Sequence, residues 1–246
     1  MNVTAIIQAR VGSTRLPGKI MKDLSGKTVL AHVLERVAKS SALDEIIVAT
    51  TTSPMDDPVI NESKRLGFPS FRGSELDVLD RFFQAAKAFK ADVIVRVTSD
   101  CPLYDPQLLR EMVEAFKPKK GLDYFSNTLV RTYPRGLDTE IFTFSALDRA
   151  HREAGLDYER EHVTPYIHQH PRLFRLENHA NAVDQSQYRW TLDTEDDWQF
   201  IKVVYDRLYL SGQIFSTEAV LSLLKKDPTL ALLNSHVEQK SYPSGQ

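Results

Sequence analysis

Short apolar runs alternate with segments of helical periodicity over the first 116 residues, and this alternation constrains the fold more than any other feature of the sequence. The apolar runs predict strands at residues 3–9, 45–50, 68–71 and 92–97. Hydrophobic residues recur at helical spacing between them, and Asp57-Pro58 and Asp105-Pro106 each indicate a helix start. Because parallel strands are joined by helical crossovers, we predict an α/β fold of three layers, with a mostly parallel sheet and helices on both faces.

The second half of the chain is less regular. Strands are predicted at residues 123–126, 139–144 and 188–192, and helices at 161–170 and around 198–208 and 219–223. No linker-like change of composition divides the 246 residues, of which 42% are hydrophobic. A chain of this length buries enough surface to fold without a disulfide or a metal staple. We therefore predict a single domain over residues 1–246.

Charge and cysteine content exclude several classes of protein. The net charge is −2 and the pI about 6.4, so we expect no nucleic-acid partner. The first apolar run is too short to span a membrane, and no basic start of a signal peptide precedes it, so we expect a soluble, cytoplasmic protein without a membrane partner. Cys101, the one cysteine, excludes an intramolecular disulfide and is expected to fill the core.

A basic segment follows the first predicted strand and contains Arg10, Arg15 and Lys19 within ten residues. Ligands bind beyond the carboxyl ends of parallel strands, and three fixed cations suit a polyphosphate. Ser13 adds a hydroxyl donor. The segment is not a Walker A motif, because five residues rather than four separate its glycines and Ile20 replaces the required Ser or Thr. We expect phosphate binding here, with a solvated basic loop as the alternative.

Two carboxylates are expected near the same edge of the sheet. Asp100 comes just after the predicted strand at 92–97, and Asp193 comes at the end of the predicted strand at 188–192. Two carboxylates beside bound phosphates would hold Mg²⁺, which is commonly bound in this way. The alternative for Asp100 is a cap or turn former. The acidic run 195–197 that follows Asp193 is read as a helix N-terminus and not as a set of metal ligands.

Five blocks of sequence resemble one family. ARVGSTRLPGK, RVTSDCPLYDP, RGLDTEIF, EREHVTPYI and RWTLDTEDD, scattered over residues 8–197, resemble the cytidylyltransferases that make CMP-activated sugars. These include the CMP-Kdo and CMP-acylneuraminate synthetases, and the blocks are most similar to the spore-coat polysaccharide biosynthesis branch. The resemblance implies a Rossmann-like fold of the nucleotide-diphospho-sugar transferase type, CTP as donor and a homodimer. It also implies an irregular sugar-binding and dimerisation subregion at about 123–180.

The resemblance further implies a role for each matching residue. Four residues would hold the triphosphate: Arg10, Ser13, Arg15 and Lys19. Of these, Arg10, Arg15 and Lys19 would act as catalytic cations. Asp100 and Asp193 would hold the magnesium. The nucleoside would lie against the stretch that contains Arg72, Ser74 and Asp77. Thr98 stands where the better-known synthetases carry a glutamine, which affects contacts to the base.

The remaining blocks are expected to face the sugar. Arg135, Asp138 and Glu140 lie in a polar turn that enters a predicted strand. Arg135 could pair with a sugar carboxylate, because the guanidinium fork matches that group, or it could form an intramolecular salt bridge. Glu161 and His162 begin a predicted helix and are expected to contact substrate, with a contact to a neighbouring backbone group as the alternative for His162. Asp138, Glu140 and Glu161 are all candidates for a general base.

These expectations combine into one predicted reaction. A sugar hydroxyl attacks the α-phosphorus of CTP and expels pyrophosphate, with Mg²⁺ as Lewis acid. The acceptor is expected to be an acidic sugar, such as a nonulosonic acid or a Kdo-like acid, used for surface polysaccharide. Two alternatives are a metal-dependent glycosyltransferase that uses a finished nucleotide sugar and a non-catalytic nucleotide-binding regulator. Release of pyrophosphate from CTP separates the first function from both alternatives.

Overall fold

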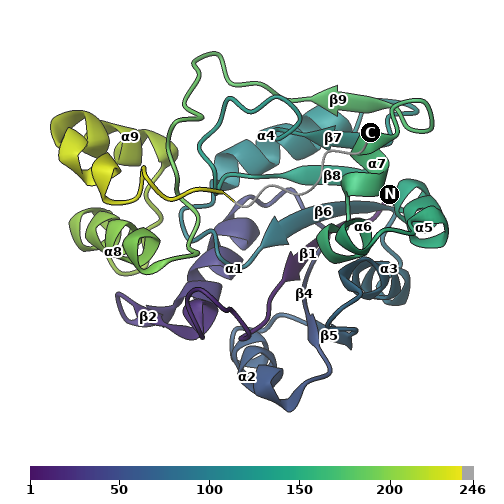
Figure 1. Ribbon diagram of the computed structural model, residues 1–246, viewed down its shortest axis with the longest axis horizontal. Helices are drawn as coiled ribbons and strands as arrows, with labels where there is room; N and C mark the ends of the chain where they lie inside the picture. Colours follow the sequence, from purple (N-terminus) through teal and green to yellow (C-terminus); the bar gives the residue numbers. More distant parts are fainter. Residues whose placement is uncertain (240–246) are drawn as a thin grey trace.

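A seven-stranded sheet forms the centre of the protein in the computed structural model, which describes residues 1–239 (Figure 1). The strand order is β5-β4-β1-β6-β8-β7-β9. Neighbouring strands are parallel except where β8 lies antiparallel between β6 and β7. These strands are β1 Val3–Gln8, β4 Glu45–Thr51, β5 Ser70–Gly73, β6 Val93–Thr98, β7 Tyr124–Ser126, β8 Glu140–Thr143 and β9 Leu176–Asn178. The predicted α/β fold with a mostly parallel sheet is confirmed.

Helices cover both faces of the sheet, which gives the expected three layers. One hydrophobic cluster joins the sheet to α1, α4, α8 and α9, and a second joins the opposite face to α3, α5 and α7. The helices are α1 Val29–Lys39, α2 Asp57–Arg65, α3 Val78–Ala88, α4 Pro106–Phe116, α5 Phe144–Glu153, α6 Asp157–His162, α7 Pro165–Gln169, α8 Glu195–Leu208 and α9 Thr217–Lys226. A separate two-stranded ribbon consists of β2 Asp23–Leu24 and β3 Lys27–Thr28. Cys101 is buried in the first cluster, as predicted.

Local capping explains where several helices begin. The Asp105 carboxylate accepts hydrogen bonds from the second and third backbone amides of α4, and Pro106 occupies the first helical position. Thr28 caps α1 and Thr194 caps α8 in the same manner. Asp57, predicted as a cap, is instead the first residue of α2, and its carboxylate pairs with Arg72.

Two predicted elements of the second half are wrong. The helix predicted over residues 161–170 is divided between α6 and α7, because Val163 adopts φ 74° and Pro165 has no backbone N–H to continue the first helix. The predicted strand at 188–192 pairs with the rest of the protein through one isolated parallel bridge, between Arg135 and Arg189. The segment therefore lies against a loop and not inside the sheet.

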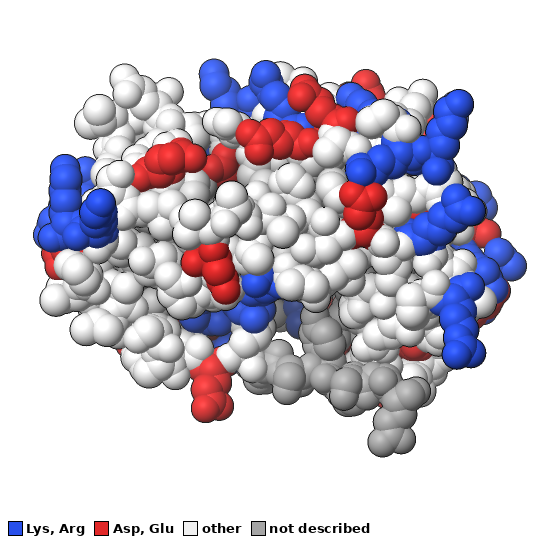
Figure 2. Space-filling view, turned by 90° about the horizontal axis from the view of Figure 1, so that it is seen from above, with Lys and Arg blue, Asp and Glu red and all other residues white. Residues whose placement is uncertain are grey.

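The parallel strands place their carboxyl ends at one edge. Gln8 of β1 pairs with Thr98 of β6 and with Ala49 of β4, so the segments that follow these strands emerge side by side. Acidic and basic side chains lie close to one another over much of the face shown in Figure 2, which agrees with the net charge of −2. Within residues 1–239 no helix is long and apolar enough to cross a membrane.

Gly136 holds the loop before β8 against the segment that leads to Asp193. Its φ is 110°, and a Cβ added there would lie 2.6 Å from the carbonyl carbon and 2.7 Å from the carbonyl oxygen of Trp190. The backbones also bond directly, since the Trp190 amide donates to the Arg135 carbonyl at 2.6 Å. Glycine is therefore required at position 136 both by conformation and by space.

We expect Gly136→Ala to lower the free energy of unfolding by about 2–4 kcal/mol, because it combines a strained φ with a backbone clash. Denaturant titration followed by circular dichroism measures the change. Gly155→Ala is the matched control, since nothing lies within 4 Å of a Cβ at that position. Equal stability of the two variants would contradict the close approach at Gly136.

Candidate active site

Three side chains that are far apart in sequence meet at the carboxyl edge of the sheet. Lys19 Nζ donates to Asp100 Oδ2 at 2.6 Å and to Asp193 Oδ1 at 2.8 Å. Lys19 lies in the segment after β1, Asp100 comes two residues after β6, and Asp193 comes just before the cap of α8. A backbone bond from the Leu192 amide to the Asp100 carbonyl, 2.8 Å long, brings the two acidic segments together.

Asp193 is held by two further cations. Arg15 Nη2 lies 3.2 Å from Asp193 Oδ2, and Arg189 Nη2 lies 3.0 Å from the same oxygen. Arg189 is 7% exposed and also pairs with Asp197, which is fully buried. The Asp197 carboxylate in turn accepts the backbone amides of Asp193 and Thr194. The acidic start of α8 therefore acts as the predicted helix N-terminus and fixes the orientation of Asp193.

Electrostatics favour the charged forms of this cluster. Burial by itself would lower the pKa of Lys19, but the charges of Asp100 and Asp193 outweigh it and raise that pKa above its ordinary value. Burial would likewise raise the pKa of Asp100, but the Lys19 ammonium lowers it below the usual range. The two carboxylates thus share one cation. Their hard oxygen donors suit Mg²⁺, and the ammonium marks a position that both can reach, so these residues fit a divalent cation.

A cavity of about 580 Å³ extends from this cluster toward the irregular second half of the chain. Its wall includes residues from the ends of β6 and β8, from the loop between β7 and β8, and from α6 and α7. Eight of the predicted site residues line it: Arg15, Asp100, Arg135, Asp138, Glu140, Glu161, His162 and Asp193. Lys19 reaches the same cavity through its contacts with the two aspartates.

Two of the three candidate bases are held by arginines. Arg131 binds Asp138 with two parallel hydrogen bonds, 2.5 and 2.8 Å long. Glu140 forms an ion pair with Arg96 and accepts hydrogen bonds from the hydroxyls of Tyr124 and Thr164. Both carboxylates are therefore engaged as acceptors, which makes them poor candidates for a general base.

The pKa values of Glu140 and His162 are both lowered, but burial is the main cause only for His162. Burial alone would raise the pKa of Glu140, but Arg96 and the two hydroxyl donors lower it below its ordinary value. The pKa of His162 is lowered, chiefly by burial. The His162 imidazole is therefore neutral at neutral pH and able to accept a hydrogen bond.

The other two predicted phosphate-binding residues lie in the segment after β1 but not in the cavity wall. Arg10 is partly exposed, with Nη1 3.6 Å from Glu75 Oε1. The Ser13 hydroxyl accepts the backbone amide of Leu16 at 3.3 Å, which helps to fold the segment.

The three residues predicted to face the nucleoside make contacts within the protein. Arg72 donates to the carbonyls of Thr51 and Ser53 and to Asp57, so it connects β5 to the start of α2. Ser74 Oγ accepts the Asp77 amide at 3.0 Å. Asp77 caps α3 and pairs with Arg160 of α6, with Nη2 and Oδ2 2.5 Å apart. None of the three belongs to the described wall of the 580 Å³ cavity.

Comparison with known proteins decides the family. A family model described as cytidylyltransferase matches residues 4–229. The chain belongs to the cytidylyltransferase family. A solved cytidylyltransferase structure from Leptospira borgpetersenii is similar to it with a TM-score of 0.90 and 37% identity, over 99% of this chain and 100% of that one.

Two curated relatives extend the comparison. The spore coat polysaccharide biosynthesis protein SpsF of Bacillus subtilis is 36% identical over 237 residues, 94% of this chain and 97% of that protein. The 3-deoxy-manno-octulosonate cytidylyltransferase of Trichlorobacter lovleyi is 38% identical over 122 residues, 50% of this chain and 48% of that protein. The resemblance inferred from the five sequence blocks is therefore confirmed.

Several residues of this candidate site were not predicted from the sequence. Arg96, Arg131 and His168 line the cavity, and Arg189 supports Asp193. Arg96 was visible as a charge inside an otherwise apolar strand, which is an unusual position and the best available signal. Arg131 and Arg189 lie in irregular segments, where no periodicity indicates which side chains turn inward.

A buried arginine on α3 was also missed. Arg81 is fully buried and donates to the Ser74 carbonyl, but its Nε and Nη2 atoms have no hydrogen-bond partner among the described residues. Burial lowers its pKa to about 10. Its Cγ lies 2.9 Å from the position of a Cβ on Gly73, so glycine at the end of β5 makes room for this side chain.

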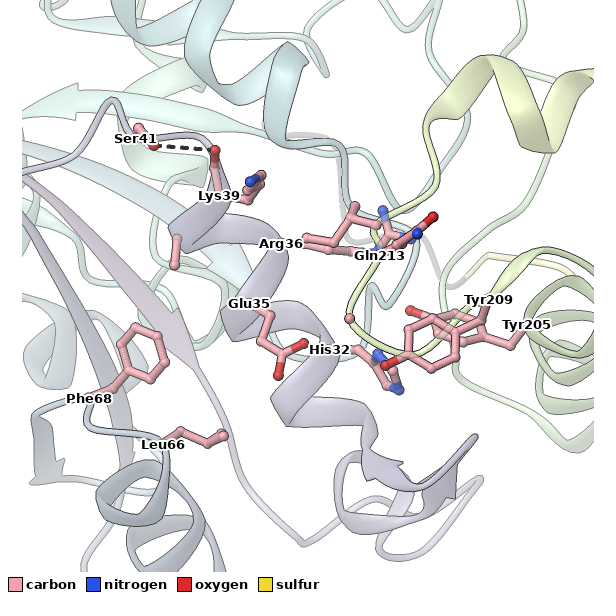
Figure 3. Close-up of a pocket in the computed structure, with 13 residues that line it drawn as sticks. His32, Glu35, Arg36, Lys39, Ser41, Leu66, Phe68, Tyr205, Tyr209 and Gln213 are labelled. Atoms are coloured by element: carbon pink, nitrogen blue, oxygen red, sulfur yellow. Dashed lines mark hydrogen bonds between the residues drawn. The ribbon is translucent and has the colours of Figure 1, made fainter.

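A second cavity of the cytidylyltransferase, about 480 Å³, lies between α1 and the end of α8 (Figure 3). Two of its charged groups are engaged by the protein itself. Glu35 accepts two hydrogen bonds from Lys27, and Arg36 donates to the carbonyls of Tyr104 and Phe215. His32 contacts the Leu24 carbonyl at 2.6 Å. This cavity lacks the paired carboxylates and the basic segment, so we assign the active site to the 580 Å³ cavity.

We expect Glu140→Gln to lower the free energy of unfolding by about 3 kcal/mol at neutral pH, because it removes the carboxylate from a buried ion pair and leaves the Arg96 guanidinium in place. The folded-state pKa of Glu140 is lowered, so its contribution is complete above pH 4.5 and is lost as the pH falls through the folded-state value. The difference between wild type and variant should therefore narrow below pH 4.5.

Urea unfolding at several pH values measures this difference. Glu114→Gln, on an exposed position of α4, is the control and should match wild type throughout. A Glu140→Gln variant as stable as wild type at pH 7 would show that the ion pair contributes nothing.

Proposed function

We propose that this cytidylyltransferase transfers CMP from CTP to the hydroxyl of an acidic sugar and releases pyrophosphate. The observation that carries the proposal is the set of charges around one cavity. Its wall combines Asp100 and Asp193, which hold Lys19, with arginines of an irregular region. A triphosphate and a sugar acid are both anions, and these two groups of residues offer each of them guanidinium or ammonium groups.

The basic segment after β1 provides the proposed triphosphate site. Arg15 and Lys19 already converge on the Asp193 carboxylate, and Arg10 and Ser13 lie in the same turn. Cations at these positions would neutralise the charge that develops on departing pyrophosphate. Asp100 and Asp193 would hold Mg²⁺, which would supply Lewis acidity at the phosphates. No covalent enzyme intermediate is needed, so positioning and electrostatics provide the acceleration.

The arginines of the irregular region provide the proposed sugar site. Arg135 lines it directly, while Arg96 and Arg131 are kept in place by Glu140 and Asp138. A guanidinium fork binds a carboxylate with two parallel hydrogen bonds, which favours an acidic acceptor over a neutral one. The name of the 3-deoxy-manno-octulosonate cytidylyltransferase relative refers to such an acid, and that of SpsF refers to polysaccharide biosynthesis. Surface polysaccharide is therefore the proposed destination of the product.

Glu161 is the candidate base that the ion pairs leave available. It lines the cavity beside His162, and no ion pair or hydrogen bond of its side chain is found within residues 1–239. A carboxylate at this place could accept the proton of the attacking hydroxyl.

Homodimerisation through residues 123–180 belongs to the same proposal. Three large hydrophobic side chains in this range are exposed in the single chain: Val130 (65%), Leu156 (54%) and Leu173 (39%). Light scattering coupled to size exclusion tests it, and a monomer at all concentrations would contradict it.

Release of pyrophosphate tests the reaction directly. Wild type is incubated with CTP, UTP, ATP or GTP, with Mg²⁺, and with Kdo, N-acetylneuraminate or a neutral hexose. We expect release that depends on both CTP and an acidic sugar, with a loss of about 100-fold or more in Asp100→Asn. Hydrolysis of a finished CMP-sugar without pyrophosphate release would instead favour a glycosyltransferase, and nucleotide binding without turnover would favour a regulator.

We expect Arg135→Met to lower kcat/KM for the acidic sugar by about 10- to 100-fold, since a charge-assisted hydrogen bond contributes about 1.5–3 kcal/mol. The KM for CTP should stay unchanged, because the proposed contact of Arg135 is with the sugar and not with CTP. Arg152→Met removes an exposed arginine from α5 and is the matched control. An unchanged sugar KM in Arg135→Met would remove this residue from the acceptor site.

A further inference from the structure

The ammonium of Lys19 occupies the place between the two acidic side chains that a divalent cation would take. Its Nζ is 2.6 Å from Asp100 Oδ2 and 2.8 Å from Asp193 Oδ1, and the Lys19 side chain is 11% exposed. One atom therefore bridges carboxylates that come from segments 93 residues apart in the chain. A metal ion that binds both carboxylates must first displace this ammonium.

Cations of the protein already balance the charges of the two carboxylates when no metal is bound. Asp193 contacts Arg15 and Arg189 in addition to Lys19, and the charge of Arg189 is compensated by Asp197. Two carboxylates thus face about two uncompensated cations before any metal arrives. A divalent ion added to this arrangement gains little net attraction, because it must replace an ion pair that already exists.

The position of Lys19 permits this displacement. Lys19 begins a short 3₁₀ turn, Lys19–Met21, directly after Gly18, which adopts φ 66°. Its ammonium is at the end of a flexible four-carbon stem, unlike the planar guanidinium of an arginine. The side chain can therefore turn from the carboxylates toward an anion in the cavity without a change in the sheet.

We propose that Lys19 is a built-in competitor of the divalent cation, so that Asp100 and Asp193 bind the metal weakly until a bound triphosphate draws the ammonium away. The inference rests on the proposed function, because it takes the triphosphate and the metal as ligands of one site. It adds that the two ligands bind with positive coupling, which is carried by the side chain of Lys19. By reciprocity the metal strengthens nucleotide binding by the same factor.

The direction in which one substitution changes the affinity for the metal distinguishes this role from that of a simple phosphate ligand. Lys19→Met removes the competitor but leaves both carboxylates, so the nucleotide-free variant should bind a divalent cation more tightly than wild type. We expect a gain of about tenfold, within the range of about 5- to 150-fold that is usual for coupling between sites. A residue that acts on phosphates alone would leave the affinity for the metal unchanged.

The test uses Mn²⁺ alone, with free Mn²⁺ measured by electron paramagnetic resonance and no nucleotide or sugar present. Wild type is compared with Lys19→Met, with Lys19→Arg and with the double variant Lys19→Met/Asp100→Asn. Lys22→Met is the matched control, since Lys22 lies in the same segment but faces Glu195 and the Trp198 ring. Far-ultraviolet circular dichroism verifies that each variant is folded.

The expected result is tighter Mn²⁺ binding in Lys19→Met, loss of that gain in the double variant, and wild-type affinity in Lys19→Arg and Lys22→Met. Equal affinity of wild type and Lys19→Met would overturn the inference. So would a gain that persists in the double variant, since the metal would then bind elsewhere. If Lys19→Met does not fold, tight Mn²⁺ binding by nucleotide-free wild type, in the low micromolar range or below, would also overturn it. Because no CTP is present, each outcome is independent of whether the proposed transfer reaction occurs.

Discussion

The contact of Lys19 with Asp100 and Asp193 is the interaction on which the arrangement of the site depends. It joins the segment after β1, the turn after β6 and the start of α8. Lys19 Nζ contacts both carboxylates, and without this cation the negative charges of Asp100 and Asp193 would repel one another. The sheet supplies the framework for the contact, because parallel strands end at one edge and release their following segments side by side.

Several acidic side chains elsewhere in the site are also paired with cations. Three carboxylates are paired with arginines: Asp197 with Arg189, Glu140 with Arg96, and Asp138 with Arg131. Pairs of this kind contribute little net stability, but breaking one leaves an uncompensated charge. Their effect here is to hold arginines at the wall of a cavity, where a ligand can use them.

Sequence reasoning succeeded where local rules govern the chain. Periodicity located the strands and helices of the first half, and Asp105 caps α4 as its position before Pro106 predicted. It failed at the break at Val163, whose positive φ hydrophobic periodicity does not reveal, and at Arg189, whose isolated bridge lies against a distant loop. The arginines that pair with Glu140 and Asp138 were also not identifiable from spacing.

The sequence by itself determined the α/β architecture, the edge of the sheet at which basic and acidic side chains gather and the residue types found there. Those properties follow from hydrophobic periodicity and from the direction of parallel strands, both of which can be read locally. The tertiary structure alone decided that Lys19 bridges the two aspartates, that Arg189 orients Asp193, and which carboxylates are held by arginines. The contacts of Lys19 and of Arg96 join distant segments, and Arg131 and Arg189 reach nearby carboxylates from segments without regular structure. Their distances therefore exist only after the chain has folded.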